Sequence, residues 1–185
     1  MAVGVGSNLG DRAARLAEGV RGLARVLRDL RCSAVYETEP EGPVAQGPFL
    51  NMCCTGSTEL GPAELLEVLM GLERASGRRR EGPRFGPRSL DLDLLLYGGR
   101  VVDEPGLRVP HPRLEERAFV LVPLADILPD WRHPGSGASV AELAARSDRS
   151  GVRTYGGSVA DLPCPRARAS ERGEADDMGR GDEEA

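Results

Sequence analysis

Residues 89–102 read SLDLDLLLYGGRVV, and this stretch decides which fold the chain can adopt. Leucine alternates with aspartate in its first half, which is the period of two that a β-strand requires, and the glycine pair that follows predicts a hairpin. Asp91 and Asp93 would therefore share one face of the strand. The opposite face would consist of three leucines: Leu92, Leu94 and Leu96. We expect a strand with one buried apolar face and one acidic face.

The segments on either side of this strand predict both strands and helices. Three further strands are expected, at residues 2–6, 32–38 and 49–58. Helices are expected within four segments: 12–30, 62–72, 109–130 and 139–147. This loose alternation, with strands joined by short or medium loops, favours an α+β fold built on a mainly antiparallel sheet. A doubly wound parallel fold is disfavoured, because GVGSNLG at residues 4–10 lacks the glycine spacing of a dinucleotide fingerprint.

Length and composition indicate one folded domain. The chain has 185 residues, enough for a single domain with its own core. Residues 158–185 contain few apolar side chains, so we expect a folded domain at 1–157 followed by a disordered acidic tail. No apolar run approaches the roughly 20 residues that a membrane-spanning helix needs, and no leader-like apolar block follows Met1. We therefore expect a cytoplasmic protein that does not bind membranes.

The charged residues exclude several kinds of phosphate chemistry. All 24 basic residues are arginine, although the net charge is −5. A P-loop, a Schiff-base enzyme and a site of the protein-kinase type each need a lysine, so none of them fits this chain. If the protein binds phosphate, arginine must neutralise it.

The acidic face of the 89–102 strand is a candidate metal site. Asp91 and Asp93 would stand about 7 Å apart along the backbone, close enough to bind one ion or to flank two. A divalent cation would relieve the repulsion between the two carboxylates, and an oxygen-only ligand set favours magnesium or manganese over zinc. The alternative is that this face is open to water and that the two aspartates only make it soluble.

Arginines gather immediately before this acidic pair. The segment GRRREGPRFGPR at residues 77–88 contains five of them: Arg78, Arg79, Arg80, Arg84 and Arg88. Guanidinium groups bind phosphate oxygens bidentately while carboxylates hold the metal, so the combination is typical of a site for a polyphosphate–metal complex. The glycines and prolines predict a loop that closes over a nucleotide. The alternative is a charged surface loop.

Four other residues leave two interpretations open. His111, one of two histidines, lies between prolines and has a structural or a functional role. Phe49 and Phe119 belong to a set of three phenylalanines and lie where a strand or helix meets a loop, either in the core or in a site. Asn51 is either a hydrogen bonder at a strand end or a group that binds substrate.

Taken together, these segments resemble 6-hydroxymethyl-7,8-dihydropterin pyrophosphokinases of the folate pathway. The resemblance spans roughly residues 2–147. It is carried by five segments: GSNLGDR at 6–12, YETEP at 36–40, FLN at 49–51, the block from Glu73 through GPRSLDLDLLLYG, and VPHPRLEERAFVLVPL at 109–124. It implies an antiparallel sheet sandwiched by helices in a ferredoxin-like arrangement. It also implies transfer of pyrophosphate from ATP to the pterin's hydroxymethyl group, releasing AMP.

The resemblance assigns roles to the residues singled out above. Asp91 and Asp93 would hold two Mg²⁺ ions that bridge the phosphates, and Arg78 and Arg88 would neutralise them. Other ATP contacts would come from six residues: Glu73, Arg80, Arg84, Leu94, His111 and Arg117. The pterin would stack between Phe49 and Phe119. Its edge would be bound at four residues: Thr38, Pro40, Gly42 and Asn51.

Some departures and alternatives remain. Phe85 stands where some family members carry tryptophan, and Pro112-Arg113 where some carry tyrosine, so the contacts that close the loop would differ. A different magnesium-dependent kinase or phosphohydrolase would use the same acidic pair and release ADP or phosphate. A nucleic-acid-binding module is disfavoured by the negative charge. We expect a monomer whose partners are ATP and a reduced pterin, with other folate enzymes as candidate associates.

Overall fold

The computed structural model describes residues 1–77, 86–157 and 159. The strands are β1 (Ala2–Ser7), β2 (Arg28–Cys32), β3 (Tyr36–Thr38), β4 (Phe49–Ser57), β5 (Asp91–Leu96), β6 (Val102–Glu104), β7 (Leu107–Val109) and β8 (Val152–Thr154). The helices are α1 (Arg12–Leu23), α2 (Pro62–Ala75), the 3₁₀ turn η1 (Leu114–Glu116), α3 (Ala118–Ile127) and α4 (Val140–Arg146).

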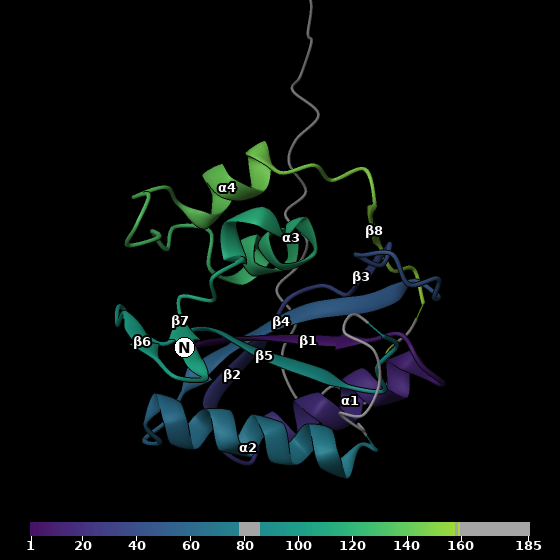
Figure 1. The fold of residues 1–185 in the computed structure, drawn as a ribbon, viewed down its shortest axis with the longest axis horizontal. Helices are drawn as coiled ribbons and strands as arrows, with labels where there is room; N and C mark the ends of the chain where they lie inside the picture. Colours follow the sequence, from purple (N-terminus) through teal and green to yellow (C-terminus); the bar gives the residue numbers. More distant parts are fainter. Residues whose placement is uncertain (78–85, 158, 160–185) are drawn as a thin grey trace, which may run out of the picture.

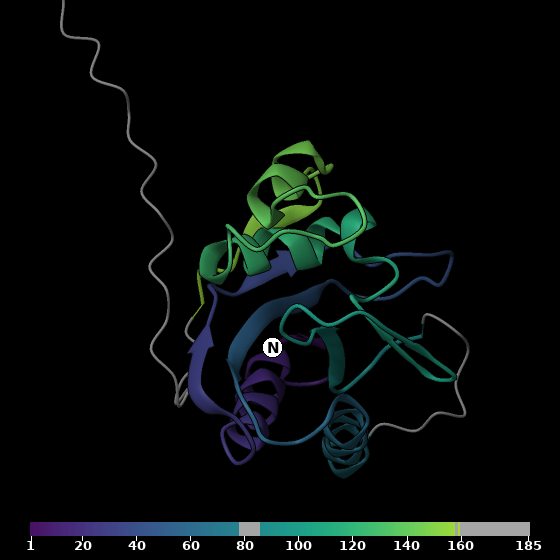
Figure 2. The same ribbon diagram turned by 90° about the vertical axis from the view of Figure 1, so that its left-hand side faces the viewer.

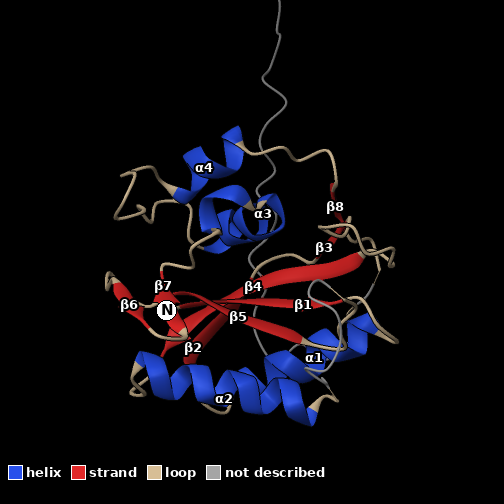
Figure 3. Ribbon diagram, in the orientation of Figure 1, coloured by secondary structure: helices blue, strands red, loops and turns tan. Residues whose placement is uncertain are grey.

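The main sheet confirms the expected α+β class. Its strand order is β5-β1-β4-β3-β8, with β2 also paired to β4, and every pairing is antiparallel. The first half of the chain runs strand, helix, two strand segments, strand, helix, strand, with β1 between β5 and β4 in the sheet. This is the predicted ferredoxin-like arrangement (Figure 3).

Helices cover both faces of this sheet. Figures 1 and 2 show α1 and α2 on one face, and α3 with α4 on the other. The neighbours Cys53 and Cys54 on β4 illustrate the two layers, since Cys53 packs in the core under α3 and Cys54 in the core over α1 and α2. Among the residues that the structure describes, no helix is long and apolar enough to cross a bilayer.

Strand β5 shows the predicted two faces, with one correction. Leu92 and Leu94 pack in the core over α1 and α2, whereas Asp91 and Asp93 lie on the α3 side. Leu96 was expected beside Leu92 and Leu94, but it packs in the core under α3. The reason is a bulge: Val3 on β1 pairs with Leu94 and Ala2 pairs with Leu96, so one residue of β5 is skipped and the alternation changes phase.

The helix expected at 12–30 is shorter than predicted. It ends at Leu23, and Arg28 already begins strand β2. Leu27 is buried and Leu30 packs against the same core, so both fit the apolar spacing of the helix although neither is helical. Asp29 has a positive φ of 52°, a conformation that no α-helix contains. The helix ends in a turn at residues 24–26, and Asp29 already lies in strand β2, where the pairing with β4 is irregular.

The strand expected at 32–38 is split into β2 and β3. Between them, Ser33 stays bonded to β4 through one backbone bond and one side-chain bond. Its amide donates to the Cys53 carbonyl (2.9 Å), and its hydroxyl accepts from the Cys53 amide (2.9 Å). The hairpin predicted at Gly98-Gly99 also differs from the observed structure. Tyr97 and Arg100 form a single bridge there, and β6 pairs with β7 instead.

Candidate active site

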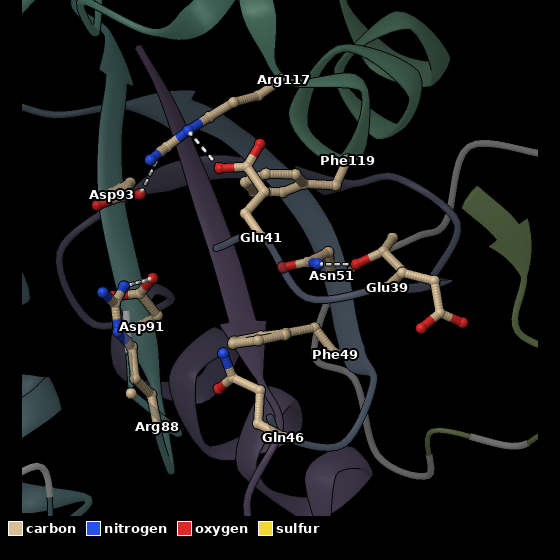
Figure 4. A pocket seen from close by; sticks show the side chains of 12 residues that line it. Glu39, Glu41, Gln46, Phe49, Asn51, Arg88, Asp91, Asp93, Arg117 and Phe119 are labelled. Carbon is tan, nitrogen blue, oxygen red and sulfur yellow. Dashed lines mark hydrogen bonds and ion pairs between the residues drawn. The ribbon is translucent and has the colours of Figure 1, made fainter. Parts of the chain in front are cut away.

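A cleft opens on the α3 face of the sheet, beside the ends of β3, β4 and β5. Its cavity volume is about 70 Å³. It lies between β3, β4, β5 and the start of α3 (Figure 4). The lining residues are Thr38, Glu39, Glu41, Gln46, Phe49, Asn51, Gly86, Arg88, Asp91, Asp93, Arg117 and Phe119. Eight of these were predicted from the sequence as site residues, and they come from segments that range from Thr38 to Phe119.

The acidic pair forms one wall of the cleft, and each aspartate faces an arginine. Asp91 is in contact with Arg88 at 2.5 Å, and Asp93 with Arg117 at 3.5 Å. The Asp93 side chain is 37% exposed, so its carboxylate is open to the cleft. Two carboxylates on one strand face, with oxygen donors only, fit a hard divalent cation such as Mg²⁺. Asp91 and Asp93 are the residues that would hold it.

Two phenylalanines line the cleft, one from a strand of the sheet and one from the helix that covers it. Phe49 begins β4 and Phe119 lies in the first turn of α3. Figure 4 shows their rings above and below the amide of Asn51. A flat heterocycle can stack on such rings, so these positions suit a planar ligand. The structure thus places both phenylalanines in the cleft. The sequence had left a position in the core as the alternative.

The polar groups between these rings come from neighbouring strands. Thr38 on β3 and Asn51 on β4 are 3% and 8% exposed, and the Asn51 amide donates to the Thr38 hydroxyl at 2.7 Å. Because the hydroxyl accepts this bond, its own proton can be donated elsewhere. The pair therefore offers both donors and acceptors to the edge of a planar ligand.

The connection between β3 and β4 covers one side of the cleft. Pro40 and Gly42 lie in this connection, but the side chains that line the cleft from it are Glu39, Glu41 and Gln46. The sequence reasoning missed those three. Glutamates and a glutamine in a Pro/Gly loop give no local sign of the elements that they will meet.

Arg117 links this connection to the acidic pair. Its guanidinium lies 3.8 Å from Glu41 and 3.5 Å from Asp93, and it also stands over the Phe119 ring at 5.4 Å. The Arg117 side chain is 14% exposed, and its buried Nε has no hydrogen-bond partner. A buried guanidinium with hydrogen-bonding capacity to spare suits an anionic ligand such as phosphate.

Asn8, which the sequence reasoning did not single out, holds two sides of the cleft together. Its carbonyl oxygen accepts from the Arg88 amide (2.7 Å), and its amide donates to Gln46 Oε1 (2.9 Å) and to the Gly47 carbonyl (3.2 Å). Its own backbone amide donates to the Arg88 carbonyl at 3.0 Å. The β1–α1 turn therefore fixes both the start of the acidic strand and the β3–β4 connection.

A second hollow lies on the other side of Asp93. It is lined by Leu66, Leu92, Asp93, Leu94, the β6–β7 hairpin residues 103–108, His111 and Pro112. Leu94 and His111, both predicted to contact ATP, are therefore found here together. Asp93 lines this hollow as well as the cleft, so ligands bound in the two would both lie beside this residue.

His111 is neutral at physiological pH. Burial lowers its pKa to about 4, with Arg117 and Arg113 adding to the effect and Asp91 opposing it. Its Nδ1 accepts from the Arg113 amide at 3.1 Å, and its own amide donates to the Leu95 carbonyl at 2.8 Å. A neutral imidazole held in this way can donate a hydrogen bond from Nε2.

The remaining predicted residues lie elsewhere. Glu73 on α2 is 3% exposed and lines neither the cleft nor the second hollow. Its carboxylate accepts from the Leu92 amide at 2.9 Å and so supports the free edge of β5. Arg78, Arg80 and Arg84 fall outside the described residues.

Comparison with known proteins assigns the family. The model of the 7,8-dihydro-6-hydroxymethylpterin-pyrophosphokinase (HPPK) family matches residues 2–129. The chain belongs to this family. A 2-amino-4-hydroxy-6-hydroxymethyldihydropteridine pyrophosphokinase of Methylorubrum extorquens is 47% identical over 152 residues, 81% of this chain and 94% of that protein. The enzyme of the same name from Synechocystis is 41% identical, covering 81% of this chain and 77% of the relative.

Other members of the HPPK family are parts of longer proteins. A mitochondrial folate synthesis bifunctional protein of Arabidopsis thaliana is 46% identical over 127 residues, 68% of this chain and 23% of that protein. A crystal structure of Plasmodium falciparum HPPK-DHPS superposes with a TM-score of 0.62 at 14% identity, covering 78% of this chain and 43% of that one. That structural likeness supports the HPPK fold.

Proposed function

We propose that this HPPK-family chain transfers the pyrophosphoryl group of ATP to the hydroxymethyl group of 6-hydroxymethyl-7,8-dihydropterin, releasing AMP. The observation that carries the proposal is that Asp93 lines both the cleft and the second hollow. A pterin in the cleft and ATP in the hollow would bring the acceptor hydroxyl and the phosphates together at the acidic pair. Positioning two substrates in this way supplies a large share of the rate in phosphoryl transfer.

The cleft is proposed to bind the pterin. Phe49 and Phe119 would stack on the two faces of the ring, while Thr38 and Asn51 bind its polar edge. The backbone of the connection that contains Pro40 and Gly42 would complete this edge. Because Thr38 and Asn51 are buried and bonded to each other, their orientation is fixed before the ligand arrives, which reduces the entropy lost on binding.

The acidic pair and the arginines are proposed to act on the phosphates. Asp91 and Asp93 would hold two Mg²⁺ ions, which neutralise charge on the phosphate oxygens when bound. Arg88 and Arg117 already contact these carboxylates and would turn to the phosphates as further positive charge. Arg78, Arg80 and Arg84 are proposed to add to this charge from the adjoining segment. Leu94 and His111 would contact ATP in the second hollow, and Glu73 would keep β5 in place.

Product analysis tests the reaction. The protein would be incubated with ATP, Mg²⁺ and 6-hydroxymethyl-7,8-dihydropterin, and the nucleotides separated over time. We expect AMP in step with pterin diphosphate. Asp93→Asn should lower kcat/KM at least about 100-fold, because it removes metal stabilisation worth several kcal/mol. Asp130→Asn, a change to an exposed aspartate, is the matched control and should keep the wild-type rate.

The other possible products distinguish the alternatives. ADP or free phosphate in place of AMP would contradict pyrophosphoryl transfer and favour a kinase or phosphohydrolase. A wild-type rate in Asp93→Asn would contradict the metal site. The monomeric state, the cytoplasmic location and association with other folate enzymes stay predictions; a match to the bifunctional Arabidopsis protein supports the last of these.

A further inference from the structure

Strand β1 has glycine where its two neighbours, β4 and β5, carry site residues. On β1, Gly6 pairs with Asn51 of β4 on one side and with Asp91 of β5 on the other. Gly4, two residues earlier on the same face, pairs with Cys53 and Asp93. Val3 and Val5 point to the core over α1 and α2. Between the amide of Asn51 and the acidic pair, β1 therefore presents bare backbone.

The two glycines differ in what a side chain would meet. A Cβ placed on Gly6 would lie 2.6 Å from Asn51 Oδ1, which is too close for any real contact. A Cβ on Gly4 would lie 3.6 Å from Leu95 Cδ1, an ordinary van der Waals distance. An alanine therefore fits at position 4, whereas at position 6 it requires the amide of Asn51 to move.

Asn51 has little room to move away. Its side chain is buried and its Nδ2 is tied to the Thr38 hydroxyl at 2.7 Å. Displacing Oδ1 would turn the amide toward the cleft or break the bond to Thr38. Toward Asp91 the situation is different, because the same Cβ would lie 3.8 Å from Asp91 Cβ, which is normal packing. The clash is thus confined to the side of Gly6 that faces Asn51.

We propose that Gly6 is a positioning residue that sets the acceptor specificity of the cleft. By leaving no side chain beside Asn51 Oδ1, it allows the amide to lie flat against β1 and to present a fixed pattern of donor and acceptor to the pterin edge. It acts through Asn51 and leaves the nucleotide side of the site alone. This inference rests on the proposed binding of pterin by Asn51.

Four variants test this role: Gly6→Ala, Gly4→Ala, Asn51→Ala and the double variant Gly6→Ala/Asn51→Ala. Each is measured for its pterin Kd by calorimetry, its KM for ATP and its melting temperature. Gly6→Ala should raise the pterin Kd about tenfold, the effect of losing one well-made hydrogen bond, and change the KM for ATP less than about twofold. Gly4→Ala, the matched control, should change neither.

The double variant decides whether Gly6 acts through Asn51. With the asparagine side chain removed, the added methyl group has nothing to displace, so Gly6→Ala should cost nothing beyond Asn51→Ala itself. If Gly6→Ala alone lowers the melting temperature, the double variant should melt at the same temperature as Asn51→Ala alone. An additive loss of pterin affinity in the double variant, or a double variant that melts below Asn51→Ala alone, overturns the proposal.

The single variants separate failure of this inference from failure of the proposed function. If Asn51→Ala weakens pterin binding while Gly6→Ala binds the pterin normally, the role of Gly6 is overturned and that of Asn51 is kept. If Asn51→Ala binds the pterin as tightly as the wild type does, the roles proposed for Gly6 and for Asn51 are both overturned. Equal loss of pterin and ATP affinity in Gly6→Ala overturns the one-sided action proposed here.

Discussion

At the scale of single residues, His111 makes stability depend on pH. Its pKa is about 4 in the folded protein because of burial, compared with about 6.5 in an unfolded chain. The unfolded chain therefore binds the proton more readily, so acid favours unfolding. We expect the His111 contribution to stability to be complete above pH 6.5 and to be lost as the pH falls toward 4. Denaturant unfolding without magnesium or nucleotide measures this, and His111→Gln should remove that part of the slope.

An NMR titration checks the same residue directly. The imidazole carbon protons of His111 should shift with a midpoint near pH 4. A midpoint near 6.5 would mean that the ring is open to water and that the acid sensitivity comes from other groups.

The planar guanidinium of Arg117 makes three contacts at once. It approaches Glu41 and Asp93 and lies over the Phe119 ring. A lysine keeps the charge but provides neither a planar group for stacking nor two-sided hydrogen bonding. Arg117→Lys should therefore lower kcat/KM about tenfold or more in the product assay, with little change in melting temperature. Activity equal to wild type would show that charge alone suffices.

At the scale of elements, Asn8 joins segments that lie far apart in the sequence. Asn8→Ala removes the bonds to the Arg88 amide, to Gln46 and to Gly47. At about 1 kcal/mol for each bond, we expect a loss of about 1–3 kcal/mol in unfolding free energy and a kcat/KM lowered at least about tenfold. Asn8→Asp is the matched control, because it keeps the acceptor for Arg88 and loses only the two donor bonds. An alanine variant as active as the aspartate variant would contradict a role in holding the start of β5.

The elements also show which parts of the fold the sequence could predict. The DLDL alternation of β5 was informative because its two faces meet different surroundings, a core and an open cleft. The helix expected to extend to Leu30 was wrong, because Leu27 is buried and Leu30 packs against the same core at helical spacing although neither is helical. The chain leaves the helix after Leu23 and pairs Arg28–Cys32 with β4, a long-range contact that the local spacing does not show.

The candidate site divides in a similar way. Asp91, Asp93 and the aromatic pair could be predicted because their residue types are unusual in their local setting or match a family motif. Asn8, Glu41 and Gln46 could not, because each acquires its role from partners brought near by the fold. Gly6 is the extreme case, since its role depends on the absence of a side chain beside Asn51.

At the scale of the whole molecule, Val159 bears on where the folded unit ends. The sequence predicted a boundary at residue 157, yet Val159 is 4% exposed and belongs to the core over α1 and α2. Removing a buried valine side chain leaves a cavity that costs about 1–3 kcal/mol. A chain ending at Gly157 should therefore melt at a lower temperature than the full chain, and Val159→Ala in the full chain should reproduce much of the loss.

Activity should respond differently from stability in these two variants. All the site residues named above precede residue 120, so well below its melting temperature the shortened chain should form AMP at the full-length rate. A shortened chain with an unchanged melting temperature would place the boundary at 157 and leave Val159 as an incidental contact. A stable but inactive shortened chain would instead mean that residues after 157 take part in the reaction.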